Sequence, residues 1–339
     1  MFIRNAWYVA AWDHELLPEG LLARRILGQP MVFWRTGDGK AVAMRDLCPH
    51  RHAPLSLGRR ENDSLRCMYH GLRFDAQGRC VEVPGQTRVP SRACVRTYPV
   101  VERKRWLWVW MGDPALADAA LIPDTFSLAD PGWRMKPGYK KFAAALLLIT
   151  DNLLDFSHLS YVHEKTFGGS SAIAEIPHEV TETENGLRVV RKVMNTVPAP
   201  YHRRLGKFEG RVNRWFDYTL ALNGVFMMGA GVQSVGRDMD DPVGALRFHT
   251  CQALTPETET STHYFFAQAH GFALDDATVT EAVFQSVDAA FNEDIEMIEA
   301  QQRNILMNPD AEMVPIGADG ALARFRRRYQ AALAAEQAA

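Results

Sequence analysis

The sequence predicts an α+β fold, with a small β domain over residues 1–115 and a larger domain of sheet and helices over residues 116–339. Three observations support this prediction. Short runs of β-branched and aromatic residues, separated by turn signals, fill the first part of the chain. Apolar residues recur at helical spacing twice further along, with strand-like sequence between the two segments. A length of 339 residues also fits about two domains.

The N-terminal part contains two predicted hairpins and one region of longer paired strands. In residues 30–44, two apolar runs flank Thr36-Gly37-Asp38-Gly39, which is typical of a tight turn. Residues 72–83 repeat this pattern around Gln77-Gly78. Residues 100–111 are rich in β-branched and aromatic side chains and favour paired strands.

The C-terminal part combines two predicted helices with a predicted sheet. Apolar residues between positions 143 and 162 recur at near-helical spacing, and so do those of residues 275–306. Asp275 and Asp276 are candidate caps for the second helix. Residues 189–268 favour strands, so we expect an antiparallel sheet flanked by helices.

Composition and charge exclude several classes of function. A formal net charge of −2 gives no electrostatic basis for binding nucleic acid or an anionic membrane surface. The longest apolar run, residues 142–149, is far shorter than the ~20 residues of a membrane span. The first residues lack a signal-peptide pattern, so we expect a soluble, cytoplasmic protein. Five cysteines are few and odd in number, which argues against a disulfide framework.

The strongest motif is Cys48-Pro49-His50, followed after sixteen residues by Cys67-Met68-Tyr69-His70. Each half supplies one thiolate and one imidazole from a short loop, which is how a Rieske [2Fe–2S] cluster is held. Structural zinc is the alternative, although zinc fingers usually group Cys with Cys and His with His. Four unrelated core residues are a second alternative, but such a doubly spaced match is rare by chance. Gly71 would let the backbone turn behind the second histidine.

A second group of metal-binding residue types lies in residues 151–163, where His158 and His163 are five residues apart. Non-haem Fe(II) oxygenases hold iron with two histidines and one carboxylate, which leaves coordination positions open. On a regular helix this spacing places the two side chains about 140° apart. Both can reach one metal only if the helix ends or bulges between them. From the spacing alone, two ordinary surface or core histidines are an equal alternative.

Both motifs resemble those of a known family. CPHR at residues 48–51 and CMYHGLRF at residues 67–74 resemble the Rieske loops of ring-hydroxylating and O-demethylating oxygenases. Respiratory Rieske proteins differ, because they carry an additional cysteine in each loop where this chain has Ala53 and Tyr69. The resemblance implies an N-terminal Rieske domain whose [2Fe–2S] cluster is bound by Cys48, His50, Cys67 and His70.

The segment DNLLDFSH, with His163 after it, is similar to the iron-binding segment of the vanillate demethylase, dicamba monooxygenase and toluenesulfonate methyl-monooxygenase group. The resemblance implies a mononuclear Fe(II) bound by His158, His163 and a late aspartate, which matches Asp294. Glu293 and Glu296 are neighbouring carboxylates that the sequence alone does not exclude.

Two more residues of this segment receive roles through the same resemblance. Asp155 lies three residues before His158, so we expect it to accept a hydrogen bond from that histidine. We also expect Asp155 to relay electrons by contacting His70 of a neighbouring subunit in a homotrimer. A solvated helix residue is the alternative for Asp155. Asn152 is expected to support the same site.

The sequence defines the substrate pocket less well. His249, Gln252 and Gln285 lie in or near the predicted strands and helix that would enclose the iron, so they are candidates for substrate contact. The basic stretch at residues 203–214 could attract an anionic substrate, although a solvated surface is its more common role. Residues 144–148 are apolar where this group usually has polar residues, which weakens the transfer of any one substrate.

The resemblance covers most of the chain and implies the terminal oxygenase of a monooxygenase that uses O2. Electrons from NADH would arrive through a flavin and iron–sulfur reductase, with or without a ferredoxin, since the chain has no Gly-x-Gly-x-x-Gly motif. The predicted reaction is O-demethylation of a methoxylated aromatic acid, which yields a phenol and formaldehyde. Hydroxylation of an aryl methyl group is the alternative, and ring dihydroxylation is third. A pure Rieske electron carrier and a zinc-stabilised binding module are hypotheses from other classes.

Overall fold

The structure is a computed structural model that describes residues 1–164, 166, 172–239, 241 and 243–338. Contacts within the chain divide it into two compact units. Met1–Pro123 and Thr255–Glu259 form the first unit, and Asp124–Leu254 and Thr260–Ala339 form the second. The domain boundary near residue 115 stays a prediction.

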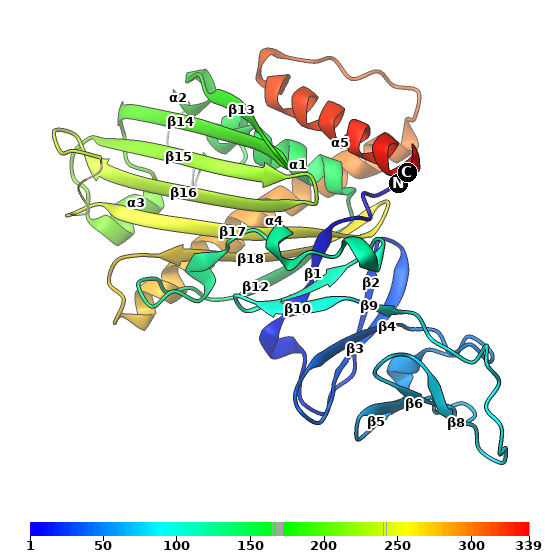
Figure 1. Ribbon diagram of the computed structural model, residues 1–339. Coiled ribbons are helices and arrows are strands. Elements are labelled where there is room, and N and C mark those ends of the chain that lie inside the picture. The colour runs from blue at the N-terminus through cyan, green and yellow to red at the C-terminus, as the bar shows by residue number, and fades with distance from the viewer. Residues whose placement is uncertain (165, 167–171, 240, 242, 339) are drawn as a thin grey trace. The chain divides into compact units, whose positions relative to one another are not determined.

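The first unit is built from short strands (Figure 1). They are β1 Trp7–Trp12, β2 Leu22–Ile26, β3 Gln29–Arg35, β4 Ala41–Arg45, β5 Arg59–Glu61, β6 Ser64–Arg66, β7 Arg73–Asp75, β8 Cys80–Glu82, β9 Thr97–Tyr98, β10 Val100–Arg103 and β11 Trp106–Trp110. Three antiparallel sheets result, in the orders β1-β11-β10, β2-β3-β4-β9 and β5-β6-β7-β8. The predicted hairpins are confirmed as β3–β4 and β7–β8.

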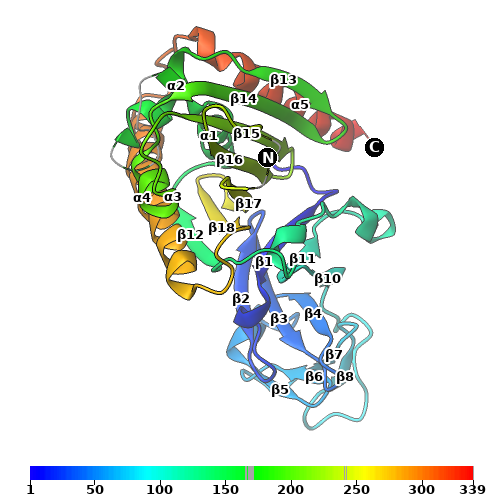
Figure 2. The same ribbon diagram turned by 90° about the vertical axis from the view of Figure 1, so that its left-hand side faces the viewer.

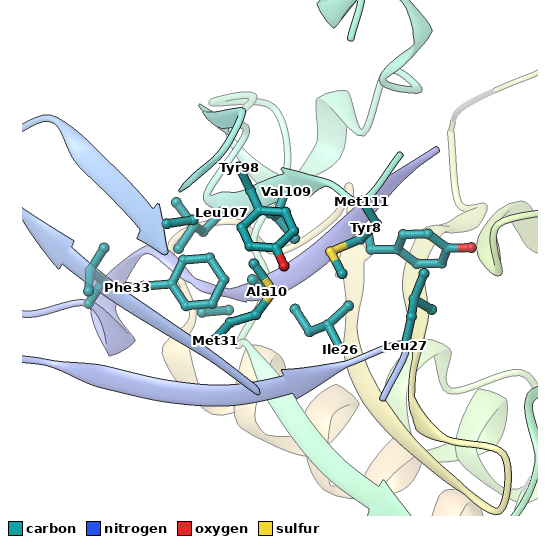
Figure 3. Packing of buried hydrophobic residues seen from close by; sticks show 13 residues of the cluster. Tyr8, Ala10, Ile26, Leu27, Met31, Phe33, Tyr98, Leu107, Val109 and Met111 are labelled. Atoms are coloured by element: carbon teal, nitrogen blue, oxygen red, sulfur yellow. The ribbon is translucent and has the colours of Figure 1, made fainter. Parts of the chain in front are cut away.

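An apolar core joins the first two of these sheets (Figure 3). Phe33 from β3 and Tyr98 from β9 pack there against Leu107 and Val109 from β11. Alternate residues of a strand point to opposite faces. Trp106, Trp108 and Trp110 of β11 are therefore buried on the other face of that strand. Burial of each such large side chain contributes about 1.5–3 kcal/mol, which holds β11 between two apolar layers.

The second unit contains one large sheet with helices. Its seven strands, in the order β12-β18-β17-β16-β15-β14-β13, pair antiparallel where their register is described. The strands are β12 Gly138–Phe142, β13 Glu179–Thr183, β14 Gly186–Thr196, β15 Val212–Ala221, β16 Val225–Ser234, β17 Leu246–Thr258 and β18 Ser261–His270. The helices are α1 Leu146–Leu154, α2 Ala172–Glu175, α3 Pro200–Gly206, α4 Ala277–Met307 and α5 Gly320–Ala338.

Helix α4 confirms the predicted long helix and its cap. The Asp276 carboxylate accepts a hydrogen bond from the Thr278 backbone N–H at 2.9 Å. The helix packs along β18 and β12 (Figure 2). Its buried residues recur every three or four positions, and Asp294 is the one charged residue among them. A carboxylate on a buried helical stripe is costly unless it binds a partner, so its position indicates a function.

Helix α1 is shorter than predicted. It ends at Leu154, and the 3₁₀ helix η6 Phe156–Ser160 follows, so the expectation of one helix from residue 143 to 162 is corrected. The Asp155 carboxylate accepts from the Ser157 backbone N–H and so begins η6 where α1 stops. In the part of the chain that the structure describes, none of the helices has the length and apolar character of a membrane span.

Candidate metal centres

The two loops with the Cys/His motifs share one backbone design. In each loop the cysteine N–H donates to the carbonyl five residues later, and the cysteine carbonyl accepts from the N–H four residues later. The bonds are Cys48–Ala53 at 2.9 Å, His52–Cys48 at 2.9 Å, Cys67–Leu72 at 2.8 Å and Gly71–Cys67 at 2.9 Å. The Cys67 loop directly follows β6, and the Cys48 loop begins three residues after the last residue of β4, so the shape of each loop is fixed locally.

The residue four positions after each cysteine has a left-handed backbone. His52 has φ 59° and Gly71 has φ 77°. A Cβ atom at Gly71 would lie 2.7 Å from Pro84 Cγ, which is too close for any larger residue. The expected backbone turn behind His70 is therefore confirmed, and it requires glycine in this loop.

The four motif side chains form two pairs. The Cys48 and Cys67 side chains are both buried, and burial raises the pKa of Cys48 to about 11. The exposed His50 and His70 rings lie 4.5 Å apart between centroids. No three ligand atoms of these residues converge within 4.8 Å. Two separate pairs suit a cluster with two irons better than the single point of a tetrahedral zinc site.

The second centre brings together His158, His163 and Asp294. Their ligand atoms lie within 4.8 Å of one another, and they are the only such trio among the described residues. Asp294 Oδ1 lies 3.1 Å from His163 Nε2 and 3.6 Å from His158 Nε2. The end of α1 at Leu154 frees the backbone to turn, so both histidines reach one point despite their spacing. The donor set fits the two-histidine, one-carboxylate site of a non-haem iron.

Hydrogen bonds orient both imidazoles of this trio. His158 Nδ1 contacts the Asp155 backbone carbonyl, and His163 Nδ1 lies 2.7 Å from Glu293 Oε2. A proton on each Nδ1 satisfies these acceptors and leaves each Nε2 lone pair facing Asp294. Asn152 Nδ2 donates to Asp294 Oδ1 at 3.0 Å, as its expected supporting role requires.

The electrostatics of the trio favour a bound cation. Burial lowers the pKa of His158, and the negative charge of Asp294 offsets this only in part. Burial also lowers the pKa of His163, but Asp294 and Glu293 outweigh that effect and raise the pKa overall. Carboxylates that stabilise a proton on an imidazole stabilise a metal ion there as well.

The expected carboxylate contact of Asp155 is corrected. Its backbone carbonyl holds His158, whereas its carboxylate accepts from the Ser157 N–H and hydroxyl at 2.8 Å each.

Glu293, which the sequence raised only as a rival metal ligand, instead provides the carboxylate that contacts His163 Nδ1. Glu296 is exposed on α4. The helical face decides between these acids, because Asp294 alone points inward.

A cavity of about 670 Å³, including its part open to solvent, adjoins the trio. Its apolar lining residues are Leu153, Phe156, Leu159, Phe216, Phe226, Met228, Ala230, Val287, Ala290 and Phe291. Its polar lining residues are Asn152, His158, His163, Tyr201, Arg214, Thr250, Gln252, Gln268 and Asp294. A cleft that combines an apolar wall with convergent polar groups is typical of a small-molecule site.

One of the three pocket candidates lines this cavity. Gln252 does so, and its side-chain oxygen accepts from Tyr264 Oη at 2.6 Å. His249 lies outside it, because odd and even residues of β17 face opposite sides, and its Nδ1 lies 2.8 Å from Ser127 Oγ. Gln285 is also outside, since it is on the exposed side of α4 and bonds Glu281.

The basic stretch at residues 203–214 divides into two parts. Arg203, Arg204 and Arg211 are exposed, as the solvated-surface interpretation predicts. Arg214 is only 1% exposed and lines the cavity. The sequence signal for this difference is the alternation of β15, in which Arg214 precedes the buried Phe216 by two positions.

Comparisons with known proteins agree with both centres. The Rieske [2Fe-2S] domain model matches residues 6–99, and the model of the vanillate O-demethylase oxygenase C-terminal domain matches residues 142–335. The toluene-4-sulfonate monooxygenase system iron-sulfur subunit TsaM1 of Comamonas testosteroni is 44% identical, over 99% of this chain and 98% of that protein. The dicamba O-demethylase oxygenase component of Stenotrophomonas maltophilia is 37% identical, over 89% and 88%.

A solved structure supports the same assignment. The crystal structure of dicamba monooxygenase bound to 3,6-dichlorosalicylic acid superposes with a TM-score of 0.93 at 33% identity, covering 100% of this chain and 99% of that one. The chain belongs to the Rieske non-haem iron monooxygenases and is an oxygenase component of that family. Such components combine a [2Fe–2S] cluster with a mononuclear iron and receive electrons from NAD(P)H through a reductase.

Proposed function

We propose that this oxygenase component oxidises a methyl group carried by an aromatic acid, and that hydroxylation of an aryl methyl group is its reaction. The observation that carries the proposal is the cavity with an apolar wall that His158, His163 and Asp294 also line. Similarity to the toluene-4-sulfonate monooxygenase subunit favours an aryl methyl group over a methoxy group. This reverses the order that the sequence motifs alone favoured.

The metal ligands are part of this proposal. Cys48, His50, Cys67 and His70 would hold the cluster, and His158, His163 and Asp294 would hold the mononuclear iron. When bound, these groups supply electrons one at a time and activate O2. The chain's own contribution is to fix the imidazoles through Asp155 and Glu293, to orient Asp294 through Asn152, and to exclude water with the apolar wall.

The proposed reaction balances with O2 and two electrons from the reductase. One oxygen atom enters a methyl C–H bond and gives a benzylic alcohol, and the other leaves as water with two protons. Apolar side chains around the methyl group favour this outcome, because water that reaches the site would allow O2 to be reduced without product.

O-demethylation of a methoxylated aromatic acid is the second candidate. It is favoured by the match of residues 142–335 to the vanillate O-demethylase oxygenase domain and by the dicamba monooxygenase structures. The same attack on a methoxy carbon gives an unstable hemiacetal, which collapses to a phenol and formaldehyde.

We also propose that the protein is a homotrimer, because of its resemblance to this family. A homotrimer would let Asp155 of one subunit face the exposed His70 of the next, which gives electrons a short path between centres. The mass of the intact holoenzyme tests the homotrimer. The variant Asp155→Asn tests electron transfer, and it should keep the mass of the wild-type assembly while losing turnover.

Product analysis tests the proposed reaction. The holoenzyme, with a chemical reductant and O2, would be given 4-methylbenzenesulfonate, 4-methylbenzoate and 4-methoxybenzoate. A hydroxymethyl product without formaldehyde supports the first candidate, and formaldehyde in step with substrate loss supports the second. Asp294→Ala is the control for background oxidation. If none of the three is oxidised while the cluster spectrum is intact, the assignment to aromatic acids is wrong.

A further inference from the structure

Arg214 is a buried cation in the wall of the substrate cavity. It lies near the start of β15, and the alternation of that strand places Arg214, Phe216 and Tyr218 on one face. Among the described residues that line the cavity, it alone carries a permanent positive charge. Asp294, the one negatively charged residue of the lining, belongs to the metal trio.

The Arg214 guanidinium contacts the Phe216 ring and the Tyr201 hydroxyl. It lies 5.3 Å from the Phe216 ring centroid and donates a hydrogen bond to the Tyr201 hydroxyl of α3. Burial lowers the pKa of Arg214, and Tyr201 offsets part of this effect. Since arginine stays protonated in proteins, the positive charge persists in this apolar surrounding.

A further polar group on the same wall has no hydrogen-bond partner. Thr250 Oγ1 is buried and unpaired among the described residues, and Thr250 lines the cavity. Thr250 lies in register with Tyr218 through Met228 of the strand between them. Because Tyr218 is four residues after Arg214 on β15, Thr250 and Arg214 lie on the same face of the sheet. An unpaired buried hydroxyl is costly, which favours a ligand that supplies an acceptor.

Arg214 and the metal trio line the same cavity from different elements. Tyr218 lies four residues from Arg214, about 13 Å along the strand. Tyr218 donates to the Leu154 carbonyl at the end of α1 and stacks on Phe156, which begins the segment that carries His158. The face of β15 that carries Arg214 therefore leads to the segment that carries His158.

We propose that Arg214, positioned by Tyr201, binds the sulfonate or carboxylate group of the aromatic substrate and so directs the opposite methyl group towards the metal trio. The inference rests on the proposed function, because it names how the substrate of that site is selected. A guanidinium is the side-chain group best suited to both anions, and the hydrogen bond to Tyr201 holds it in the cavity wall. Arg214 is thus a specificity residue for anionic aromatics.

Binding measured apart from turnover tests this inference. Calorimetry with the holoenzyme would compare 4-methylbenzenesulfonate with 4-methylbenzenesulfonamide, which has a similar shape without the charge. We expect the wild type to prefer the sulfonate. Arg214→Gln should weaken sulfonate binding about 10- to 100-fold and change sulfonamide binding by less than about threefold. Arg214→Lys should fall between them, and Arg211→Gln, at an exposed arginine, should bind like the wild type.

The outcomes separate the two proposals. Equal loss for the charged and neutral ligands in Arg214→Gln overturns the inference and leaves a packing role. If that variant does not fold, the wild-type preference decides, since equal affinity for the two ligands also overturns it. Repeating the series with 4-methylbenzoate shows whether carboxylates share the site. Selective binding of the anion without oxidation in the product assay would sink the proposed reaction and leave the role of Arg214 standing.

Discussion

The two metal-binding regions are assembled over different distances along the chain. Cys48 and Cys67 each begin a loop that closes on itself within five residues. His163 and its partner Glu293 meet across 130 residues, from a turn after α1 and from the middle of α4. The first region depends on local backbone geometry, whereas the second depends on how a helix packs against a sheet. Damage to packing should therefore affect the iron trio more than the cluster loops.

The largest expected effect separates the two regions completely. Cys67→Ser removes a proposed cluster ligand, so we expect the red-brown colour and reductase-driven turnover to fall to background. Mononuclear iron should remain, because the trio lies in the other unit. Visible absorbance and acid-labile sulfide measure the cluster, and total iron together with these values gives the mononuclear iron. Cys94→Ser, at an exposed cysteine, is the matched control, and a cluster that survives in Cys67→Ser contradicts the assignment.

Asp294→Ala should produce the opposite pattern. We expect loss of mononuclear iron and of product formation, with the cluster spectrum and its reduction by the reductase unchanged. Glu296→Ala, on the exposed side of α4, should keep full activity. If Asp294→Ala still forms product and keeps its mononuclear iron, Asp294 is not an iron ligand.

Glu293→Gln should have an intermediate effect. The amide retains the size of the side chain but weakens the hold on His163 Nδ1, so we expect iron affinity or turnover to fall about 10- to 100-fold. Titration of the iron-depleted enzyme with Fe(II) measures the affinity. Glu296→Gln controls for the change of charge on α4. Unchanged affinity would show that the trio does not need this carboxylate.

The smallest expected effect concerns the support of α1. Arg326 of α5 donates from Nε to both Asp151 oxygens at 3.1 Å, beside Asn152. Arg326→Ala leaves a mostly buried carboxylate without these bonds, so we expect a loss of about 1–3 kcal/mol in the free energy of unfolding. Denaturant unfolding measures it, with Arg327→Ala at an exposed position as control. If this variant loses the cluster before the mononuclear iron during unfolding, the expectation that packing supports the iron trio more than the cluster loops is wrong.

The family and the cofactor types were predictable from the sequence because their signals are local. A Cys/His pair within three or four residues of chain defines each cluster loop, and left-handed φ at Gly71 follows from its glycine. The late aspartate was predictable only by resemblance, since Glu293, Asp294 and Glu296 are chemically similar. The structure separates them by helical face, with Asp294 buried and Glu296 exposed.

The sequence by itself determined the α+β class, the two metal-binding motifs and the capped helix α4, because each depends on residues close together in the chain. Only the tertiary structure decided which residues meet in the cavity. It turned His249 and Gln285 away, buried Arg214 among exposed arginines, and gave Glu293 its contact with His163. The physical reason is that the face of a strand or helix that becomes buried is chosen by the partner against which it packs, and that partner lies far away in sequence.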